Sequence, residues 1–179
     1  MNLPNKITIF RVCMIPVFLV FMLVPGIPYG NFIATAVFVI ACLSDAVDGH
    51  IARKHNLVTN FGKFMDPIAD KLLVCSALIC FVALSYMPAW MVIVIIAREF
   101  IINGFRLIAS DNGVVIAASY WGKFKTIAQM IACILLIVQL PFSFADVLEQ
   151  IFIWLSLVLT VVSLCEYIWK NRNVLKETK

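Results

Sequence analysis

The stretch DAVDGHIARKHNLVTNFGKFMDPIAD, residues 45–70, places four aspartates between two long apolar segments. They are Asp45, Asp48, Asp66 and Asp70. An ionised carboxylate at bilayer depth costs several kcal/mol unless it is paired, neutralised or bound to a cation. Four of them together therefore predict a large compensating positive charge, and a divalent metal ion is its most economical source.

The remainder of the chain is strongly apolar. Of its 179 residues 63% are hydrophobic and 13% are charged, about half the charged share of a typical globular domain. This composition predicts an all-α polytopic membrane protein, with residues 1–179 as a single transmembrane domain and no cleavable signal peptide. Six scattered cysteines without a C-x-x-C pair predict neither a zinc site nor a disulfide framework. The net charge of +4 is modest and indicates little by itself. We expect no nucleic-acid partner.

Six segments have about the length that a membrane-spanning helix needs. The Pro25-Gly26-Ile27-Pro28 run closes the first, and Pro88 divides a long uncharged stretch into the third and fourth. The expected helices cover approximately residues 7–24, 31–52, 62–84, 88–109, 119–140 and 147–169.

The basic residues indicate the orientation of these spans. With both termini on one side, the connections 25–30, 84–90 and 141–150 fall on the other side, and none contains Lys or Arg. By the positive-inside rule, both termini and the aspartate cavity are then cytoplasmic. We expect a multi-pass protein of a bacterial cytoplasmic membrane. Its basic tail, about 170–179, is expected to lie against lipid headgroups.

Helical geometry makes the aspartate stretch specific. On the second expected helix, Asp45 and Asp48 share an arc of about 100° with Gly49 and Ala52. On the third helix, the other two aspartates share an arc of about 80° with a glycine, Gly62. Small residues allow a neighbouring helix or a ligand to approach the backbone closely.

Ligands that offer only oxygen favour Mg2+ or Mn2+ over zinc or copper. Four carboxylates are enough for two such ions about 3.5–4 Å apart, an arrangement suited to displacement at phosphorus. The alternative interpretation is a set of helix-end aspartates that face water or pair with Arg53, Lys63 and Lys71.

The stretch matches D-x2-D-G-x2-A-R-x8-G-x3-D-x3-D at every defined position, and in this it resembles the CDP-alcohol phosphotransferases. The resemblance implies six transmembrane helices, a homodimer and a metal-dependent reaction, in which a hydroxyl attacks the phosphate of a CDP-linked lipid or CDP-alcohol and CMP leaves. It also implies metal binding by all four aspartates, with Asp70 as general base as well. The implied CDP pocket consists of Thr8, Gly49, Ala52, Arg53 and Gly62.

Basic residues further along the chain bear on the acceptor alcohol. Arg98 lies well inside an apolar segment, close to two helical turns before Arg106, and the next segment opens with Lys123 and Lys125. A second phosphate is an obvious partner for such cations. Within the family, this pattern looks most like the enzymes that use CDP-diacylglycerol and sn-glycerol 3-phosphate. That resemblance assigns these four cations to the glycerol phosphate.

Other interpretations stay open for these residues. Inositol phosphate or phosphatidylglycerol could be the acceptor instead. Lys123 and Lys125 could extend to anionic headgroups, Arg98 could pair with Glu99 or a neighbouring helix, and Arg11 could be an anchor on the cytoplasmic side.

A different class of protein, an ion-coupled transporter, is the least favoured alternative, because no internal repeat is visible and the acidic residues cluster near one face. Aromatic residues near the expected helix ends, such as Trp90, Tyr167 and Trp169, are typical of interfacial belts.

Overall fold

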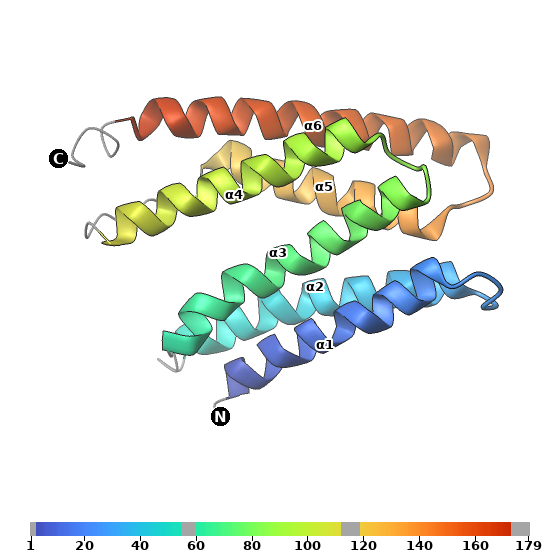
Figure 1. Cartoon of the computed structure of the whole chain (residues 1–179), viewed down its shortest axis with the longest axis horizontal. Helices are drawn as coiled ribbons and strands as arrows, with labels where there is room; N and C mark the ends of the chain where they lie inside the picture. Colours follow the sequence, from blue (N-terminus) through green and yellow to red (C-terminus); the bar gives the residue numbers. More distant parts are fainter. Residues whose placement is uncertain (1–2, 55–59, 112–118, 173–179) are drawn as a thin grey trace. The chain divides into compact units, whose positions relative to one another are not determined.

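The computed structural model describes the backbone of residues 3–54, 60–111 and 119–172, and the side chains of residues 7–44, 68–69, 71–109 and 119–172. Over these residues the chain is all helical, without a strand, which confirms the predicted all-α class and the six helices (Figure 1). Two of them, α1 and α6, begin four residues earlier than predicted. The helices are α1 Leu3–Leu23, α2 Gly30–Lys54, α3 Asn60–Ala83, α4 Ala89–Asp111, α5 Tyr120–Val138 and α6 Ser143–Lys170.

The helices group into two compact parts. The first part contains Met1–Tyr86 and Cys133–Leu140, and thus α1, α2, α3 and the end of α5. The second part contains Met87–Ala132 and Pro141–Lys179, and thus α4, the start of α5, and α6. A single domain over residues 1–179 stays a prediction.

The predicted break near Pro88 has a clear local cause. Ser85 adopts a positive φ of 62°, and the Tyr86 amide donates to the Phe81 carbonyl at 2.8 Å, five residues back. The Ser85 amide donates to the Val82 carbonyl at 3.0 Å. This pair of bonds is the Schellman ending of a helix, and the Phe81 and Tyr86 rings, 6.4 Å apart, supply its usual hydrophobic contact.

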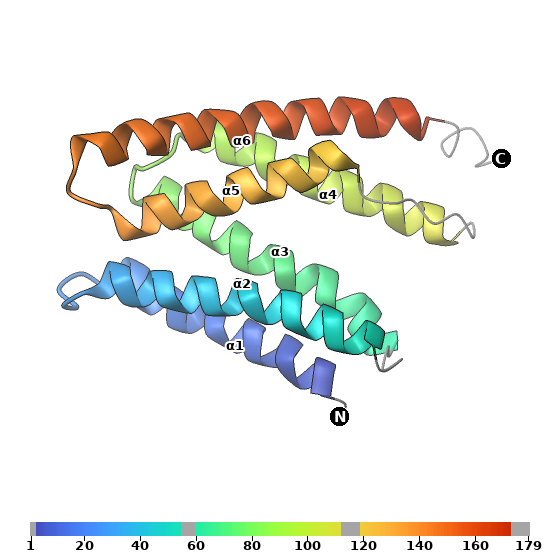
Figure 2. The same ribbon diagram turned by 180° about the vertical axis from the view of Figure 1, so that it is seen from behind.

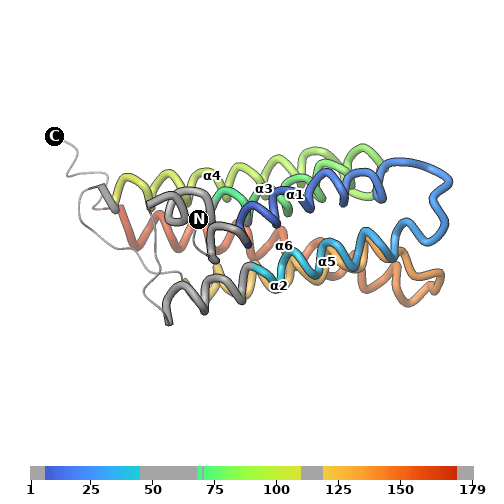
Figure 3. Tube along the Cα trace, turned by 90° about the horizontal axis from the view of Figure 1, so that it is seen from below, coloured from blue at the N-terminus to red at the C-terminus, as the bar shows by residue number. Residues whose placement is uncertain are grey.

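The turn between α1 and α2 depends on two glycines. Gly26 has a φ of +85°, which L-residues with side chains rarely adopt. A Cβ atom on Gly30 would lie only 3.0 Å from the carbonyl oxygen of Phe21. The turn therefore folds the two helices into a tight antiparallel hairpin (Figure 3).

In the first part, α1, α2 and α3 pack on one another, as Figures 1 and 2 show from opposite sides. At the centre of the α1–α2 contact, the Phe18 and Phe38 rings lie 5.9 Å apart. Small residues are also buried in this part, and such residues let membrane helices approach closely. The buried alanines are Ala34 and Ala41 of α2 and Ala69 and Ala77 of α3.

In the second part, the buried seam is polar. α4 packs on α6, and the buried face of α6 carries Ser156, Thr160, Ser163 and Tyr167 at helical spacing. The Thr160 hydroxyl donates to the Ser156 carbonyl at 2.7 Å, and the Ser163 hydroxyl donates to the Thr160 carbonyl at 3.1 Å. These bonds satisfy the hydroxyl protons within the helix and leave the oxygens able to accept.

The distribution of polarity fits a lipid environment. Large apolar side chains such as Ile79, Ile93 and Leu107 are exposed, whereas Arg98 and Lys125 are buried. This is the reverse of a soluble amphipathic helix. Within the part of the chain that the structure describes, α5 and α6 are long and apolar enough to span a bilayer, and α1, α2 and α3 contain shorter apolar stretches. Six spans, the side of the termini and the cavity stay predictions.

Candidate active site

The aspartate motif lies on two helices that adjoin one short connection, residues 55–59. The first half of the motif, through Ala52, falls within α2, and the second half, from Gly62 to Asp70, falls within α3. The predicted shared faces require that both halves of the motif are helical, and the backbone of both halves is helical. The side chains of Asp45, Asp48, Gly49, Ala52, Arg53, Gly62, Asp66 and Asp70 lie outside the described residues.

The register of both helices relates these positions to the packed seam. Asp45 and Asp48 follow Ala41, a fully buried α2 residue, by four and seven positions. On α3, Asp66 precedes the buried Leu73 by seven positions. Intervals of four and seven keep residues on one helix face. The motif thus continues, in register, the stripes that hold α1, α2 and α3 together.

Thr8 occupies the corresponding level of α1. It precedes the helix end at Leu23 by fifteen residues, and Asp45 follows the helix start at Gly30 by fifteen. At 1.5 Å per residue, both lie about 22 Å from the same turn. Thr8 and Arg11 are each only 1% exposed. Arg11 is therefore buried in the protein at this level instead of reaching into open solvent as an anchor.

Arg98, predicted to bind the acceptor phosphate, is held between α4 and α6. Its Nη2 and Nε atoms donate to Ser163 Oγ at 2.9 and 3.2 Å, and its Nη1 donates to Glu99 Oε1 at 3.0 Å. The residue is 7% exposed. All three guanidinium nitrogens thus have protein partners, as the alternative interpretation of Arg98 anticipated.

Lys125 of α5 joins the same cluster. Its Nζ forms an ion pair with the Glu99 carboxylate, and the residue is 2% exposed, so it does not extend to the headgroup layer. Gly122, one turn earlier, makes room for the cluster, since a Cβ atom there would lie 3.3 Å from Arg98 Nη2. Among the described side chains, this cluster contains two cations and one carboxylate.

Arg106 lies further along α4 in a different setting. Its Cζ stands 5.9 Å from the centre of the Tyr167 ring, a cation–π distance, and Phe105 meets the same ring edge-on at 6.2 Å. Among the described residues, neither the buried Arg106 Nε nor the buried Tyr167 hydroxyl has a hydrogen-bond partner.

Lys123 differs from the other predicted acceptor residues because it is exposed, with Nζ 5.5 Å from the centre of the Tyr120 ring. Its position matches the alternative of a lysine that reaches toward headgroups. The structure thus brings Arg98 and Lys125 together around Glu99, and leaves Lys123 at the surface.

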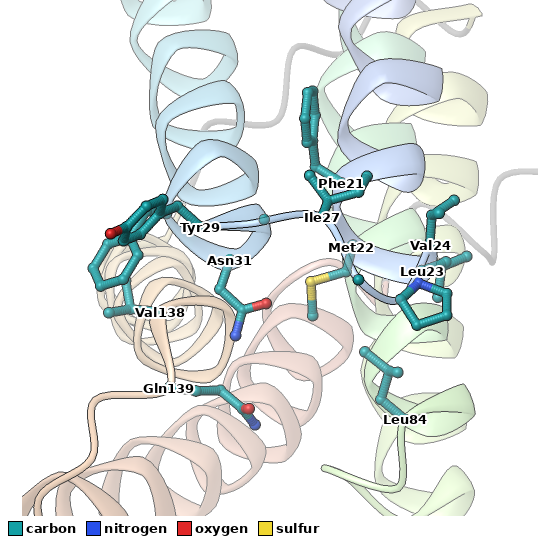
Figure 4. Close-up of a pocket in the computed structure, with 14 residues that line it drawn as sticks. Phe21, Met22, Leu23, Val24, Ile27, Tyr29, Asn31, Leu84, Val138 and Gln139 are labelled. Atoms are coloured by element: carbon teal, nitrogen blue, oxygen red, sulfur yellow. The ribbon is translucent and has the colours of Figure 1, made fainter.

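A cavity of about 480 Å³ lies elsewhere in the first part, at the α1–α2 turn and the ends of α3 and α5. Figure 4 shows the amide side chains of Asn31 and Gln139 on one side of it, and Leu23 and Leu84 on the other. Its lining carries no charged side chain and none of the predicted site residues.

Three contributors to the polar seam were not predicted from the sequence. Glu99 entered only as an alternative partner of Arg98, Ser163 was not considered, and Tyr167 was expected in an interfacial belt although it is 3% exposed. A signal was available, because Ser156, Thr160, Ser163 and Tyr167 recur at intervals of four, three and four. That spacing places polar groups along one stripe of an apolar helix.

A helical chain with an apolar exterior, a carboxylate motif on adjoining helices and a buried cationic cluster has the features of a membrane-embedded phosphotransferase. The family model described as CDP-alcohol phosphatidyltransferase matches residues 1–162. The chain belongs to this family, as the sequence motif predicted, and it is therefore an enzyme of the phosphatidyltransferase type.

Individual relatives are similar over almost their whole length. A Bacillus subtilis protein named CDP-diacylglycerol–glycerol-3-phosphate 3-phosphatidyltransferase is 48% identical, over 98% of this chain and 97% of its own. A Haemophilus influenzae protein of the same name is 37% identical, over 93% of this chain and 91% of its own. A Mycobacterium tuberculosis protein named probable phosphatidylglycerophosphate synthase is also 37% identical, over 93% and 80%.

Proposed function

We propose that this protein transfers a phosphatidyl group from CDP-diacylglycerol to sn-glycerol 3-phosphate, with phosphatidylglycerophosphate and CMP as products. The observation that carries the proposal is the 48% identity, over 98% of the chain, to a protein named for this reaction. Family membership and the buried cations of α4 and α5 support it. Phosphatidylglycerophosphate is then the first committed intermediate towards phosphatidylglycerol and cardiolipin.

Two divalent ions, Mg2+ or Mn2+, fit the donor set of the motif. Its four carboxylates supply only oxygen, and they lie in register on helices that adjoin one connection. Among the described side chains, no group of three His, Cys, Asp or Glu residues could hold a metal. Bound at the motif, the ions would neutralise the pyrophosphate and the departing CMP. The ligands would be Asp45, Asp48, Asp66 and Asp70.

The reaction needs a base for the acceptor hydroxyl. In the proposed step, the hydroxyl oxygen bonds to the phosphatidyl phosphorus while the bond from that phosphorus to the CMP oxygen breaks. Asp70 takes the hydroxyl proton as general base. It is the last aspartate of the motif, nearest along α3 to the packed core that begins at Ala69 and Leu73.

The cytidine diphosphate is proposed to lie against the small residues of the motif. Gly49, Ala52 and Gly62 leave the α2 and α3 backbones accessible, and Arg53 supplies charge for a phosphate. Thr8 fits this pocket because its helix level matches that of Asp45. A threonine hydroxyl both donates and accepts hydrogen bonds, as a nucleotide contact requires.

The acceptor phosphate is proposed to bind the cations of the second part. Arg98 and Lys125 are buried, and both contact the Glu99 carboxylate. Arg106 lies two turns along the same helix. Lys123, exposed beside Tyr120, is proposed to meet the acceptor as it enters.

The proposed membrane arrangement follows from charge. Six spans with both termini cytoplasmic would open the active-site cavity to the cytoplasm, where glycerol 3-phosphate is dissolved. We place the protein in a bacterial cytoplasmic membrane and, from its family, as a homodimer.

Two alternatives stand against this function. Inositol phosphate or phosphatidylglycerol could replace glycerol 3-phosphate as acceptor, because either would present a phosphate to the same cations. An ion-coupled transporter would carry metal across a membrane without forming a lipid product.

One assay separates these possibilities. The protein, purified in detergent, is supplied with CDP-diacylglycerol and each acceptor in turn, and CMP release is measured with and without a chelator. We expect that, of the acceptors tested, only glycerol 3-phosphate supports CMP release from CDP-diacylglycerol. A chelator should abolish this release, and added Mg2+ or Mn2+ should restore it. Release that is greater with another acceptor would overturn the assignment. Metal flux into liposomes without lipid product would favour the transporter.

A further inference from the structure

In the contact between α4 and α6, two arginines of α4 each meet a hydroxyl-bearing residue of α6, and the two pairs lie one above the other. In the first pair, Arg98 of α4 donates to Ser163 of α6 and also to Glu99. In the second pair, Arg106 of α4 stacks on the ring of Tyr167 of α6. Residues 163 and 167 are one helical turn apart on the same face of α6.

The two pairs differ in how their polar atoms are satisfied. Every guanidinium nitrogen of Arg98 has a partner. By contrast, Arg106 Nε and the Tyr167 hydroxyl are both buried, and neither has a hydrogen-bond partner among the described residues. A buried polar group without a partner is costly, and native structures contain few. Two in contacting residues indicate a missing third group.

The chemistry of the missing group follows from the atoms that lack it. Arg106 Nε can only donate, and a phenol hydroxyl donates readily to an anion. A single partner for both must therefore accept from two directions and carry negative charge to match the guanidinium. A phosphate meets both conditions, whereas a neutral hydroxyl meets only the first.

We propose that the Tyr167 hydroxyl, together with Arg106 Nε, binds the phosphate of the acceptor alcohol. Tyr167 is then an acceptor-specificity residue that holds the guanidinium on its ring and donates from its oxygen. Its near-perpendicular contact with Phe105 fixes the ring plane, at an angle of 89°. This inference rests on the proposed function, because it assigns a residue to the acceptor in that reaction.

Tyr167→Phe tests the hydroxyl alone, because the ring and its contacts with Phe105 and Arg106 persist. We expect the KM for glycerol 3-phosphate to rise roughly 10- to 100-fold, as for a lost hydrogen bond to a charged group. The KM for CDP-diacylglycerol and the thermal unfolding temperature should stay as in the wild type. Tyr86→Phe is the matched control, since the Tyr86 ring also contacts a phenylalanine ring, at 6.4 Å, but lies in the α3–α4 turn.

Direct binding supplies the second measurement. Inorganic phosphate should inhibit the wild type competitively against glycerol 3-phosphate, and about tenfold more weakly in Tyr167→Phe. An unchanged acceptor KM and unchanged phosphate inhibition in that variant would overturn the inference. A fall in turnover with both KM values unchanged would also overturn it, by assigning Tyr167 a structural role.

Failure of the proposed function gives a different result. In that case the wild type itself releases no CMP with glycerol 3-phosphate. If the wild type instead uses inositol phosphate, the same comparison of Tyr167→Phe with Tyr86→Phe is made with that acceptor. An acceptor KM raised in Tyr167→Phe alone would uphold the inference, and equal KM values would refute it.

Discussion

The two parts of the molecule differ in the side chains that form their helix–helix contacts. In the first part, α1, α2 and α3 meet through alanines and the Phe18–Phe38 ring contact. In the second part, α4, α5 and α6 meet through Arg98, Glu99 and Lys125 with hydroxyls of α6. The apolar contacts are stabilised by close packing alone, whereas the polar contacts are stable only if each buried charge is paired.

This difference suggests a division of labour. The helices that form the apolar seam of the first part also carry the aspartate motif, and thus the groups proposed for the chemical step. The polar seam of the second part contains the cations proposed for the acceptor phosphate. Changes in the first part should therefore act mainly on turnover, and changes in the second part mainly on acceptor affinity.

The largest effect is expected at the proposed base. Asp70→Asn keeps the size of the side chain but removes its ability to take a proton, so turnover should fall by about 10²–10⁴-fold. The measurement is CMP release at saturating concentrations of both substrates. Asp146→Asn, at an exposed position in the first turn of α6, is the matched control. Wild-type turnover in Asp70→Asn would show that Asp70 is not the base. It would also contradict the expectation that changes in the first part act mainly on turnover.

The next effect should appear in stability. Glu99→Gln removes the carboxylate that both Arg98 and Lys125 contact, which should cost on the order of 3–5 kcal/mol. Thermal unfolding in detergent should occur at a clearly lower temperature than in the wild type. Glu99→Gln combined with Lys125→Met restores the charge balance and should recover most of the stability. Equal unfolding temperatures for wild type and Glu99→Gln would show that the cluster does not depend on this carboxylate.

A smaller effect, confined to the acceptor, is expected for Arg106. Arg106→Ala should raise the KM for glycerol 3-phosphate by roughly 10- to 100-fold and leave the KM for CDP-diacylglycerol unchanged. Initial rates over a matrix of both substrate concentrations give the two constants. If the KM values for both substrates rise equally, Arg106 stabilises the fold of the second part and does not bind the acceptor specifically.

The smallest effect should come from Lys123. This exposed lysine lies beside the Tyr120 ring and is screened by solvent ions, so Lys123→Ala should change the acceptor KM by about twofold or less. The effect should shrink further at high salt. A change as large as that of Arg106→Ala would place Lys123 inside the acceptor pocket.

Much of the fold could be read from the chain. The helix ends follow from glycine and proline positions, and the Ser85–Tyr86 ending of α3 lies two residues from the predicted break at Pro88. The motif could be placed on α2 and α3 because helical periodicity is a local property. What failed was the assignment of Tyr167 to an interfacial belt, since a position near a helix end does not reveal which neighbour covers it.

The sequence by itself determined the family, the six helices and the position of the aspartate motif on α2 and α3. Each of these depends on residues close together in the chain or on a fixed spacing. Only the tertiary structure decided which cations are already paired. Arg98 and Ser163 are 65 residues apart in the chain, and Glu99 and Lys125 are 26 apart. No periodicity relates residues on different helices, so their pairing depends on how the helices pack.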